Sequence, residues 1–280
     1  MENISSELME KYNKLKDIIS GYKSVAVAFS SGVDSAFLLY AAKDTLGEGV
    51  VAVTATSFFF PARELEEAKE FCCKLGIKHI LAEIDENDIE HFTENPKNRC
   101  YYCKTHLFTK LKSIAMDEGM NEIIEGSNVD DLGDYRPGLQ ALKELDIKSP
   151  LREAGLTKAD IRALSKHFDL PSWKKPSFAC LASRIPYGEK ITRQKLSMIE
   201  KAENYLLGLG FEQFRVRIHG GEGINSGYIA RIELLPGEFP KMLDENLRDT
   251  LYQKFREIGF AYTALDLKGY RTGSMNETFL

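Results

Sequence analysis

A short apolar run that ends in a serine-glycine turn constrains the fold more than any other segment. Residues 24–29 read Ser-Val-Ala-Val-Ala-Phe, Ser30-Ser31-Gly32 follows, and residues 33–43 then have the pattern of a helix. Apolar runs of this length are typical of a parallel strand that is buried on both faces. We therefore expect a strand, a tight turn and a helix, in that order.

The same alternation continues along the chain. Further strands are expected at residues 50–56, 77–84 and 122–126, and further helices at residues 64–75, 104–118 and from Thr157 onward. Strands that alternate with helices predict an α/β fold with a doubly wound parallel sheet. From Thr192 the pattern changes to that of a smaller α+β unit, so we predict two domains, residues 1–188 and 189–280.

The composition of the chain argues against some classes of function. The chain has 280 residues and a formal net charge of −5, which argues against a general nucleic-acid binder, because such proteins are usually basic. No apolar run approaches the roughly 18–20 residues that span a membrane. Residues 1–21 lack the apolar centre of a signal peptide. We expect a cytoplasmic protein with no membrane partner.

The turn after the first strand has the features of an anion site. Backbone N–H groups in such a turn, and the positive end of the following helix, bind phosphates. The hydroxyls of Ser30 and Ser35 can donate to phosphate oxygens, whereas Asp34 fits only if a magnesium ion accompanies the phosphate. The lysine of kinase-type loops is missing. An ordinary serine-rich helix cap stays open as an alternative.

This turn resembles the PP-loop, S-G-G-x-D-S, of ATP pyrophosphatases. The resemblance implies that the loop binds ATP and that ATP is cleaved between its α and β phosphates. Ser31 departs from the pattern, because glycine is usual there; if φ is positive at this position, serine costs about 1 kcal/mol over glycine and the loop still forms. The residues expected to bind ATP are Ser30, Ser31, Gly32, Val33, Asp34 and Ser35 of the loop, together with Asp131.

Five cysteines, an odd number in a reducing compartment, point to metal ligation, catalysis or burial rather than to disulfides. Cys100 and Cys103 have C-x-x-C spacing at the start of an expected helix, so their thiolates can bind one metal or adjacent irons of a cluster. Cys180, in a proline-rich loop, is a third candidate ligand. His106 as a fourth would favour zinc, and a redox dithiol is another alternative.

The adjacent pair Cys72-Cys73 has a different interpretation. Neighbouring helix residues point about 100° apart, so the two sulfurs cannot easily bind one ion. We expect packing, with at least one of the pair facing the core.

Three further segments carry a more specific resemblance. Residues 98–104, 126–138 and 176–188, taken together with the phosphate loop, look like the LarE family of ATP-dependent sulfur transferases. The resemblance covers most of the chain, and the last segment is its most specific part. It implies the fold of the adenine nucleotide alpha hydrolases.

The resemblance also implies a reaction. LarE proteins adenylylate a carboxylate of pyridinium-3,5-biscarboxylic acid mononucleotide and replace its oxygen by sulfur. The product leads to the nickel-pincer nucleotide cofactor of lactate racemase and related enzymes. The expected cofactors are ATP and Mg²⁺, and the expected partners are the nucleotide substrate, a sulfide donor and further copies of the chain in a homo-oligomer.

The family has two forms, which differ in their source of sulfur. One has a single cysteine at the position of Cys180 and gives up its own sulfur. The other has cysteines at the positions of Cys100, Cys103 and Cys180 and resembles a holder of a [4Fe–4S] cluster. This chain carries all three, so we favour the cluster form. The sacrificial role of Cys180 stays open.

Arginines supply the expected contacts to the substrate. Arg215 and Arg217 alternate on one strand, so they face the same side and can clamp a phosphate, although a solvated strand face is the alternative. Arg184, four residues after Cys180, is expected to hold a substrate carboxylate. Arg136 is expected to contact the substrate from a loop that follows a strand, where open α/β sheets bind ligands.

Two other functions share the phosphate loop. An amidotransferase or synthetase would deliver ammonia and would not need Cys180. A tRNA thiolase would need a basic surface for RNA, which the net charge of −5 argues against.

The motif gives a first testable prediction. We expect Asp34→Asn to abolish pyrophosphate release from ATP, because a neutral amide cannot hold the magnesium ion as a carboxylate does. Pyrophosphate release by the purified variant measures this. A folded variant that releases pyrophosphate at the normal rate would contradict the PP-loop assignment.

Overall fold

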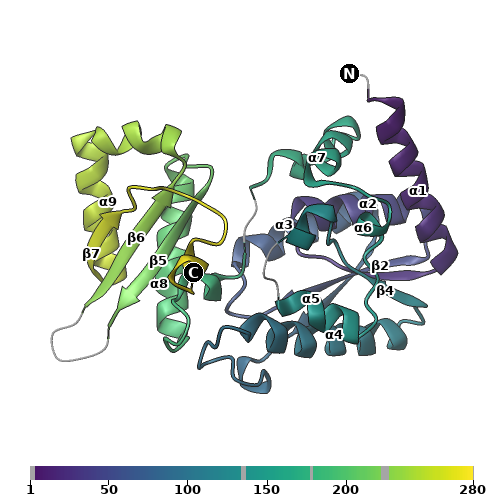
Figure 1. Ribbon diagram of the computed structural model, residues 1–280, viewed down its shortest axis with the longest axis horizontal. Coiled ribbons are helices and arrows are strands. Elements are labelled where there is room, and N and C mark those ends of the chain that lie inside the picture. Colours follow the sequence, from purple (N-terminus) through teal and green to yellow (C-terminus); the bar gives the residue numbers. More distant parts are fainter. Residues whose placement is uncertain (1–3, 134–136, 177–178, 222–226, 280) are drawn as a thin grey trace. The chain divides into compact units, whose positions relative to one another are not determined.

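The computed structural model describes residues 4–133, 137–176, 179–221 and 227–279. The chain forms two compact units, and each is described by itself (Figure 1). The first consists of Met1–Phe92 and Asn98–Ser177, and the second of Thr93–Lys97 and Phe178–Leu280. The predicted domain boundary after residue 188 stays a prediction; residues 178–188 group with the second unit, where the N–H of Gly188 donates to the carbonyl of Asn95.

A parallel sheet with strand order β3-β2-β1-β4 forms the centre of the first unit. The predicted parallel α/β architecture is therefore confirmed. Its strands are β1 Val25–Ala28, β2 Val50–Thr56, β3 Lys78–Glu83 and β4 Glu122–Ile124. Its helices are α1 Ser6–Tyr22, α2 Val33–Leu46, α3 Ala62–Leu75, α4 Arg99–Asp117, α5 Pro137–Glu144, α6 Pro150–Glu153 and α7 Lys158–His167.

Helices cover both faces of this sheet (Figure 1). Successive strand residues point to opposite faces. Val25 and Val27 therefore join the core with α1, α2, α3, α6 and α7, whereas Ala26 joins the core with α4 and α5. Burial on both faces explains why the first strand reads as an unbroken apolar run.

The order of the strands fixes where a ligand can bind. From β1 the chain runs outward through β2 to β3, and then returns to place β4 on the other side of β1. The loops after β1 and β4 therefore leave the sheet in opposite directions. Such a switch point, at the carboxyl ends of the strands, is where open α/β sheets bind ligands.

The second unit has a small mixed sheet with strand order β5-β6-β7. One face packs against the helices through Phe214, Val216, Ile218, Ile232 and Leu234, which are almost fully buried. The opposite face carries arginines. The elements are α8 Arg193–Gly208, β5 Phe214–Gly220, β6 Tyr228–Leu234, α9 Glu245–Ile258 and β7 Phe260–Leu265.

No helix within the described ranges is long and apolar enough to cross a membrane.

The spacing of Thr157 and Asp160 in the sequence predicts a capping box at the start of α7, and the structure contains it. The Thr157 hydroxyl accepts from the Asp160 N–H, and the Asp160 carboxylate accepts from the Thr157 N–H, both at 3.1 Å. Asp160 also accepts from Lys11 of α1 at 2.8 Å. These bonds fix the first turn of α7 in the first unit.

Loss of this cap has a measurable effect. We expect Thr157→Ala to lower the free energy of unfolding by about 1 kcal/mol, because the Asp160 N–H loses the hydroxyl that accepts from it. Urea unfolding measures the change. Thr109→Ala, which removes an exposed mid-helix hydroxyl that bonds to Thr105, is the control and should change stability by less than about 0.5 kcal/mol. Equal stability of wild type and Thr157→Ala would contradict the role of the cap.

Candidate functional site

The phosphate loop joins β1 to α2 as a closed turn. Ser31 has φ 54°, which is the left-handed conformation considered for this position from the sequence. The hydroxyls of Ser30 and Ser35 lie 3.1 Å apart, and Ser35 donates to the carbonyl of Gly32 at 3.2 Å. Both hydroxyls therefore lie beside the first turn of α2.

The N-terminus of α2 can bind an external hydrogen-bond acceptor. Its N-cap is Gly32, which forms no side-chain cap. The first N–H groups of a helix have no partner within the helix, and the helix dipole adds positive potential there. An oxyanion such as a phosphate group suits these donors.

Gly126, after β4, leaves room beside this turn. A Cβ atom at Gly126 would lie 3.0 Å from the Ser35 nitrogen and 3.3 Å from the Asp34 carbonyl carbon. Contacts this short force one of the two loops to move. Glycine therefore lets the two loops at the switch point approach each other closely.

Asp34 is the acidic side chain of the loop, and it accepts hydrogen bonds from Lys158 and Asn128. Lys158, the first residue of α7, donates to one carboxylate oxygen at 2.5 Å, and Asn128 donates to the other at 3.3 Å. Burial raises the pKa of Asp34 above its ordinary value, while Lys158 opposes that rise. The nearby Asp131 carboxylate raises the pKa further.

Lys175 approaches the other end of the loop. Its ammonium group donates to the carbonyl and the hydroxyl of Ser31 at 3.0 and 2.9 Å and also pairs with Glu67. Arg162 of α7 holds the backbone carbonyl of Lys175 at 2.8 Å. Two lysines therefore contact the phosphate loop, one at Ser31 and one at Asp34.

Two residues of the loop after β4, Asp131 and Arg136, were expected to bind ligands, and the first of them lies within the described residues. Asp131 accepts from the N–H of Asn128 at 2.9 Å, and this bond orders the loop beside Asp34. Arg136 lies outside the described residues.

Cys100 and Cys103 lie in the first turn of α4, and both are partly exposed. Helix residues three apart are neighbours on one face. Arg99 donates to the Cys100 sulfur at 3.7 Å. Among the residues that the structure describes, no group of three or more His, Cys, Asp or Glu side chains is arranged to hold a metal, and Cys180 belongs to the other unit.

Cys72 and Cys73 have the predicted packing role. Cys72 is buried in the core against α2, and burial raises the pKa of its thiol to about 12. Cys73 is exposed.

Arg184 fixes the backbone of the Cys180 loop in the second unit. Its guanidinium donates to the carbonyls of Ala179 and Cys180 at 2.6 and 3.1 Å. It also forms a bidentate pair with Glu203 of α8, with both distances 2.9 Å. Glu203 in turn accepts from the N–H of Val216 on β5 at 3.1 Å. One ion pair therefore ties the cysteine loop to α8 and β5.

This arrangement differs from the expectation for Arg184. The side chain is fully buried and its donors are used within the protein, so in this structure it presents nothing to a substrate carboxylate. Glu203 is only 1% exposed. Burial opposes its ionisation, but Arg184 holds the pKa of Glu203 below its ordinary value. Sequence spacing could not show this, because the pair joins residues 19 positions apart.

Arg215 and Arg217 share one face of β5, as predicted, but they are buried rather than solvated. Arg215 stacks on Tyr270 at 5.1 Å, and burial lowers its pKa to about 10, which leaves it charged at neutral pH. Arg217 donates to Glu233 at 2.8 Å and to Ser274 at 2.9 Å. Its Nε is buried without a hydrogen-bond partner among the described residues.

The segment before α4 is bound to the segment after Cys180. The Asn95 side chain donates to the carbonyl of Pro186 at 2.7 Å, and the N–H of Ile191 donates to the carbonyl of Thr93 at 2.9 Å. Residues 93–97 therefore belong to the unit that contains Cys180, although the helix with Cys100 begins two residues later.

Comparison with known proteins identifies the family. No family model matches the chain. It is 40% identical over 269 residues to an uncharacterized protein of Synechocystis, covering 96% of this chain and 98% of that protein. It is 36% identical over 265 residues to the pyridinium-3,5-bisthiocarboxylic acid mononucleotide synthase of Lactiplantibacillus plantarum, covering 94% and 91%. The chain belongs to the LarE family.

A further relative comes from an archaeon. The chain is 26% identical over 269 residues to an uncharacterized protein of Methanocaldococcus jannaschii, covering 95% of this chain and 98% of that protein. The matches to these three relatives span both units, so the similarity is not confined to the loop after β1.

Several residues beside the loop after β1 were missed from the sequence. Lys158 carried one usable signal: it directly follows the helix cap Thr157, and a cation is unfavourable at a helix N-terminus. Lys175 had no sequence signal of a role at this loop, apart from its place in a proline-rich segment. Asn128 and Gly126 lay in a segment from which only Asp131 and Arg136 were expected to bind ligands.

Breaking the Arg184–Glu203 pair should destabilise the second unit. We expect Arg184→Met to lower the free energy of unfolding by about 3–5 kcal/mol, because it leaves a buried carboxylate without its charged partner. The double variant with Glu203→Leu should recover a large part of the loss. Denaturant unfolding measures both variants. Arg248→Met, at an exposed ion pair, is the control and should stay within about 0.5 kcal/mol of wild type. A mild effect of Arg184→Met, equal to that of the control, would contradict the assigned role.

Proposed function

We propose that this protein is an ATP-dependent sulfur transferase that acts on pyridinium-3,5-biscarboxylic acid mononucleotide in biosynthesis of the nickel-pincer nucleotide cofactor. One observation carries the proposal: 36% identity over 94% of the chain to the synthase of Lactiplantibacillus plantarum. The name of that protein describes a pyridinium mononucleotide with two thiocarboxylate groups.

The phosphate loop is the proposed ATP site. The hydroxyls of Ser30 and Ser35 and the first turn of α2 would bind the phosphates, with Asp34 and Asp131 holding magnesium. A substrate carboxylate oxygen then attacks the α phosphorus, and pyrophosphate leaves. The acyl adenylate that forms is attacked at its carbonyl carbon by sulfide, and AMP leaves with the original oxygen.

Arginines are the proposed contacts of the mononucleotide phosphate. Arg215 and Arg217 are charged and lie on one sheet face, and the buried Nε of Arg217 lacks a partner among the described residues. A phosphate oxygen would satisfy that N–H. Arg136 is a further proposed contact. Arg184 is not included, because its guanidinium holds the cysteine loop.

The cysteines are the proposed ligands of a [4Fe–4S] cluster. The donor set fits such a group, since Cys100, Cys103 and Cys180 are all partly exposed thiols and Cys100 accepts a charged hydrogen bond of the kind that tunes clusters. With three protein ligands, the cluster would leave one iron available to supply sulfide. Arg184 would keep the Cys180 backbone in place for this role.

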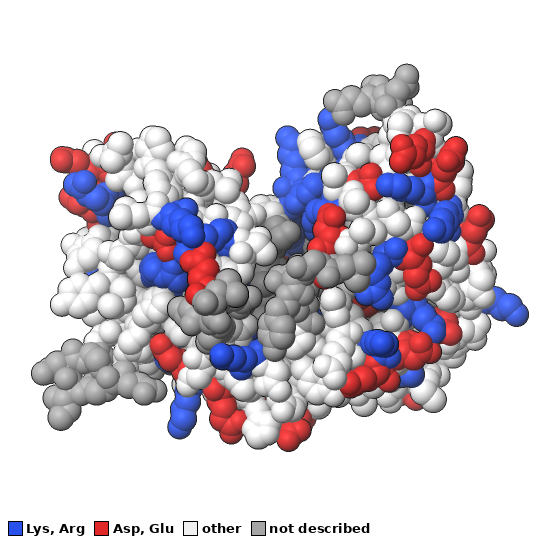
Figure 2. Space-filling view, viewed as in Figure 1, with Lys and Arg blue, Asp and Glu red and all other residues white. Residues whose placement is uncertain are grey.

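The distribution of surface charge supports a small substrate over RNA. On the face of the first unit shown in Figure 2, lysines and arginines are interspersed with acidic side chains. RNA-binding surfaces instead gather basic side chains along one face.

Iron content tests the source of the sulfur. After anaerobic reconstitution with iron and sulfide, we expect about four irons per chain and the broad visible absorbance of a cluster. Cys180→Ala should lose both, because one of three ligands is gone. Cys73→Ala, which removes an exposed cysteine in α3, is the matched control and should retain the iron.

Two other outcomes would revise the proposal. Absence of iron, together with loss of about one H₂S from Cys180 after turnover with ATP, would favour the sacrificial form. AMP formation that consumes ammonia instead of sulfide would contradict sulfur transfer.

A further inference from the structure

We propose that residues 272–279 form a gate over the mononucleotide site: they cover Arg217 in the free protein, lift to admit the substrate phosphate and close on it again. This inference rests on the proposed contact between Arg217 and that phosphate, and it adds an element that controls entry. The starting observation is burial, because Arg217 is only 5% exposed. A phosphate can reach this guanidinium group only if an element that covers it moves.

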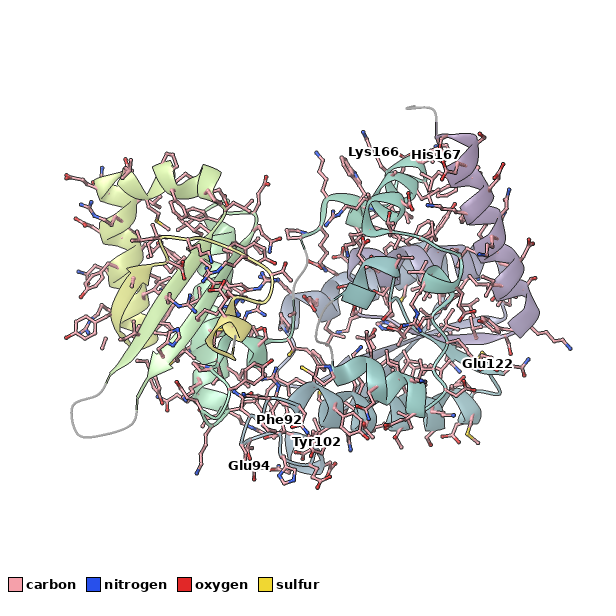
Figure 3. The ribbon with its side chains drawn as sticks, in the orientation of Figure 1. Phe92, Glu94, Tyr102, Glu122, Lys166 and His167 are labelled. Carbon is pink, nitrogen blue, oxygen red and sulfur yellow. The ribbon has the colours of Figure 1, made fainter. Side chains whose placement is uncertain are left out.

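The C-terminal segment covers the arginine face of the second unit. It crosses in front of β5 and β6 (Figure 1). The Arg217 guanidinium donates to the Ser274 hydroxyl at 2.9 Å, and Ser274 donates to Glu233 at 2.8 Å. The ring of Tyr270 stacks on Arg215 at 5.1 Å. Figure 3 shows side-chain nitrogens, in blue, between the sheet and this yellow segment. The segment therefore shields the arginines from solvent.

A phosphate and the closed gate use different donors of Arg217. Its Nη2 donates to Glu233 and Ser274, and its Nη1 donates to the carbonyl of Ser183 at 2.9 Å. Its Nε is buried and has no hydrogen-bond partner among the described residues. A phosphate oxygen would satisfy this N–H. Ser274 can therefore keep its own bond while a phosphate is bound, so the gate closes over the ligand and does not compete with it.

The base of the gate, residues 266–271, is fixed to the sheet. The N–H of Tyr270 donates to the carbonyl of Leu234 on β6 at 2.7 Å. Arg271 donates to the carbonyl of Gly269 at 2.9 Å. Gly273 follows within the gate and has φ 74°. Because glycine adopts both signs of φ without strain, the chain can turn there while the base stays in place.

Few contacts hold the gate closed. Among residues 272–275 and Glu277, whose exposure the structure describes, only Ser274 is buried, so none of their apolar side chains is anchored in the core. The contacts described between these residues and the sheet are the hydrogen bonds of Ser274 and a 3.5 Å contact between the Met275 sulfur and Arg231. Segments with few buried apolar contacts open at a low cost in free energy.

An exposed ion pair latches the gate to its base. Glu277 belongs to the short helix η6, Ser274–Phe279, and forms a bidentate pair with Arg271. Lys268, also in the base, lies 3.5 Å from the same carboxylate. The Glu277 side chain is 41% exposed, so this latch is weak and lies apart from the buried arginines. A change at Glu277 therefore alters opening without removing a substrate contact.

Binding rates without turnover test the gate, using Glu277→Gln in the full-length protein. The probe is nicotinic acid mononucleotide, a pyridinium mononucleotide with one carboxylate, followed by surface plasmon resonance without ATP. The association and dissociation rates should both rise about 2- to 5-fold, because the weakened gate opens more often. The dissociation constant should stay within about twofold of wild type, since the latch is present with and without ligand. Loss of a simple substrate contact would instead change chiefly the dissociation rate.

Hydrogen exchange measures opening independently of the ligand. A helix as short as η6 does not persist away from the sheet, so the amides of residues 274–279 should exchange about 2- to 5-fold faster in Glu277→Gln. Bound mononucleotide should slow their exchange in both proteins. Glu257→Gln, which removes an exposed carboxylate paired with Lys254 on α9, is the matched control and should leave every rate at its wild-type value. Circular dichroism compares the folding of the variants.

The failing outcomes are distinct. Unchanged binding rates and unchanged exchange in a folded Glu277→Gln variant would overturn the gate while leaving the mononucleotide site in place. A raised dissociation rate with a normal association rate would also overturn it, because a gate acts on both. A wild-type protein that does not bind the mononucleotide, or a folded Arg217→Met variant that binds it as tightly as wild type, would overturn the proposed substrate site and the gate together.

Discussion

The central position of β1 is the constraint on which the first unit depends. Parallel strands flank it on both sides, so its end is the point where successive connections turn in opposite directions. The loop after β1 and the loop after β4 must therefore meet, and Gly126 allows that meeting because a side chain there would collide with α2. Asp34, Asn128 and Lys158 come together as a consequence.

Buried charge has a comparable role in the second unit. A buried bidentate arginine–carboxylate pair stabilises a protein no more than a packed apolar pair would. It does, however, require a narrow range of distances and angles between the two side chains. The Arg184–Glu203 pair holds a short loop in place, because the same guanidinium also donates to the carbonyls of Ala179 and Cys180. The backbone at Cys180 is thereby fixed to the core of the unit.

The sequence predicted the parts of the structure that depend on local pattern. The strand before Ser30 and the Thr157 cap follow from neighbouring residues. A positive φ at Ser31 was considered from the sequence but not predicted, and the structure has it. The short helices α5 and α6 were missed because they are too brief to show periodicity. Contacts such as Lys158–Asp34, 124 residues apart, and Arg184–Glu203 depend on tertiary pairing, which spacing alone does not contain. The convergence of the three cysteines stays a prediction.

The interleaving of the two units limits how such a protein can be rearranged. Residues 93–97 lie between β3 and α4 in the sequence, yet they bind the segment around Pro186 and Ile191. A fragment that starts at residue 178 would leave the N–H groups of Gly188 and Ile191 without the carbonyls of Asn95 and Thr93. Recombination at a single crossover point would therefore transfer an incomplete second unit.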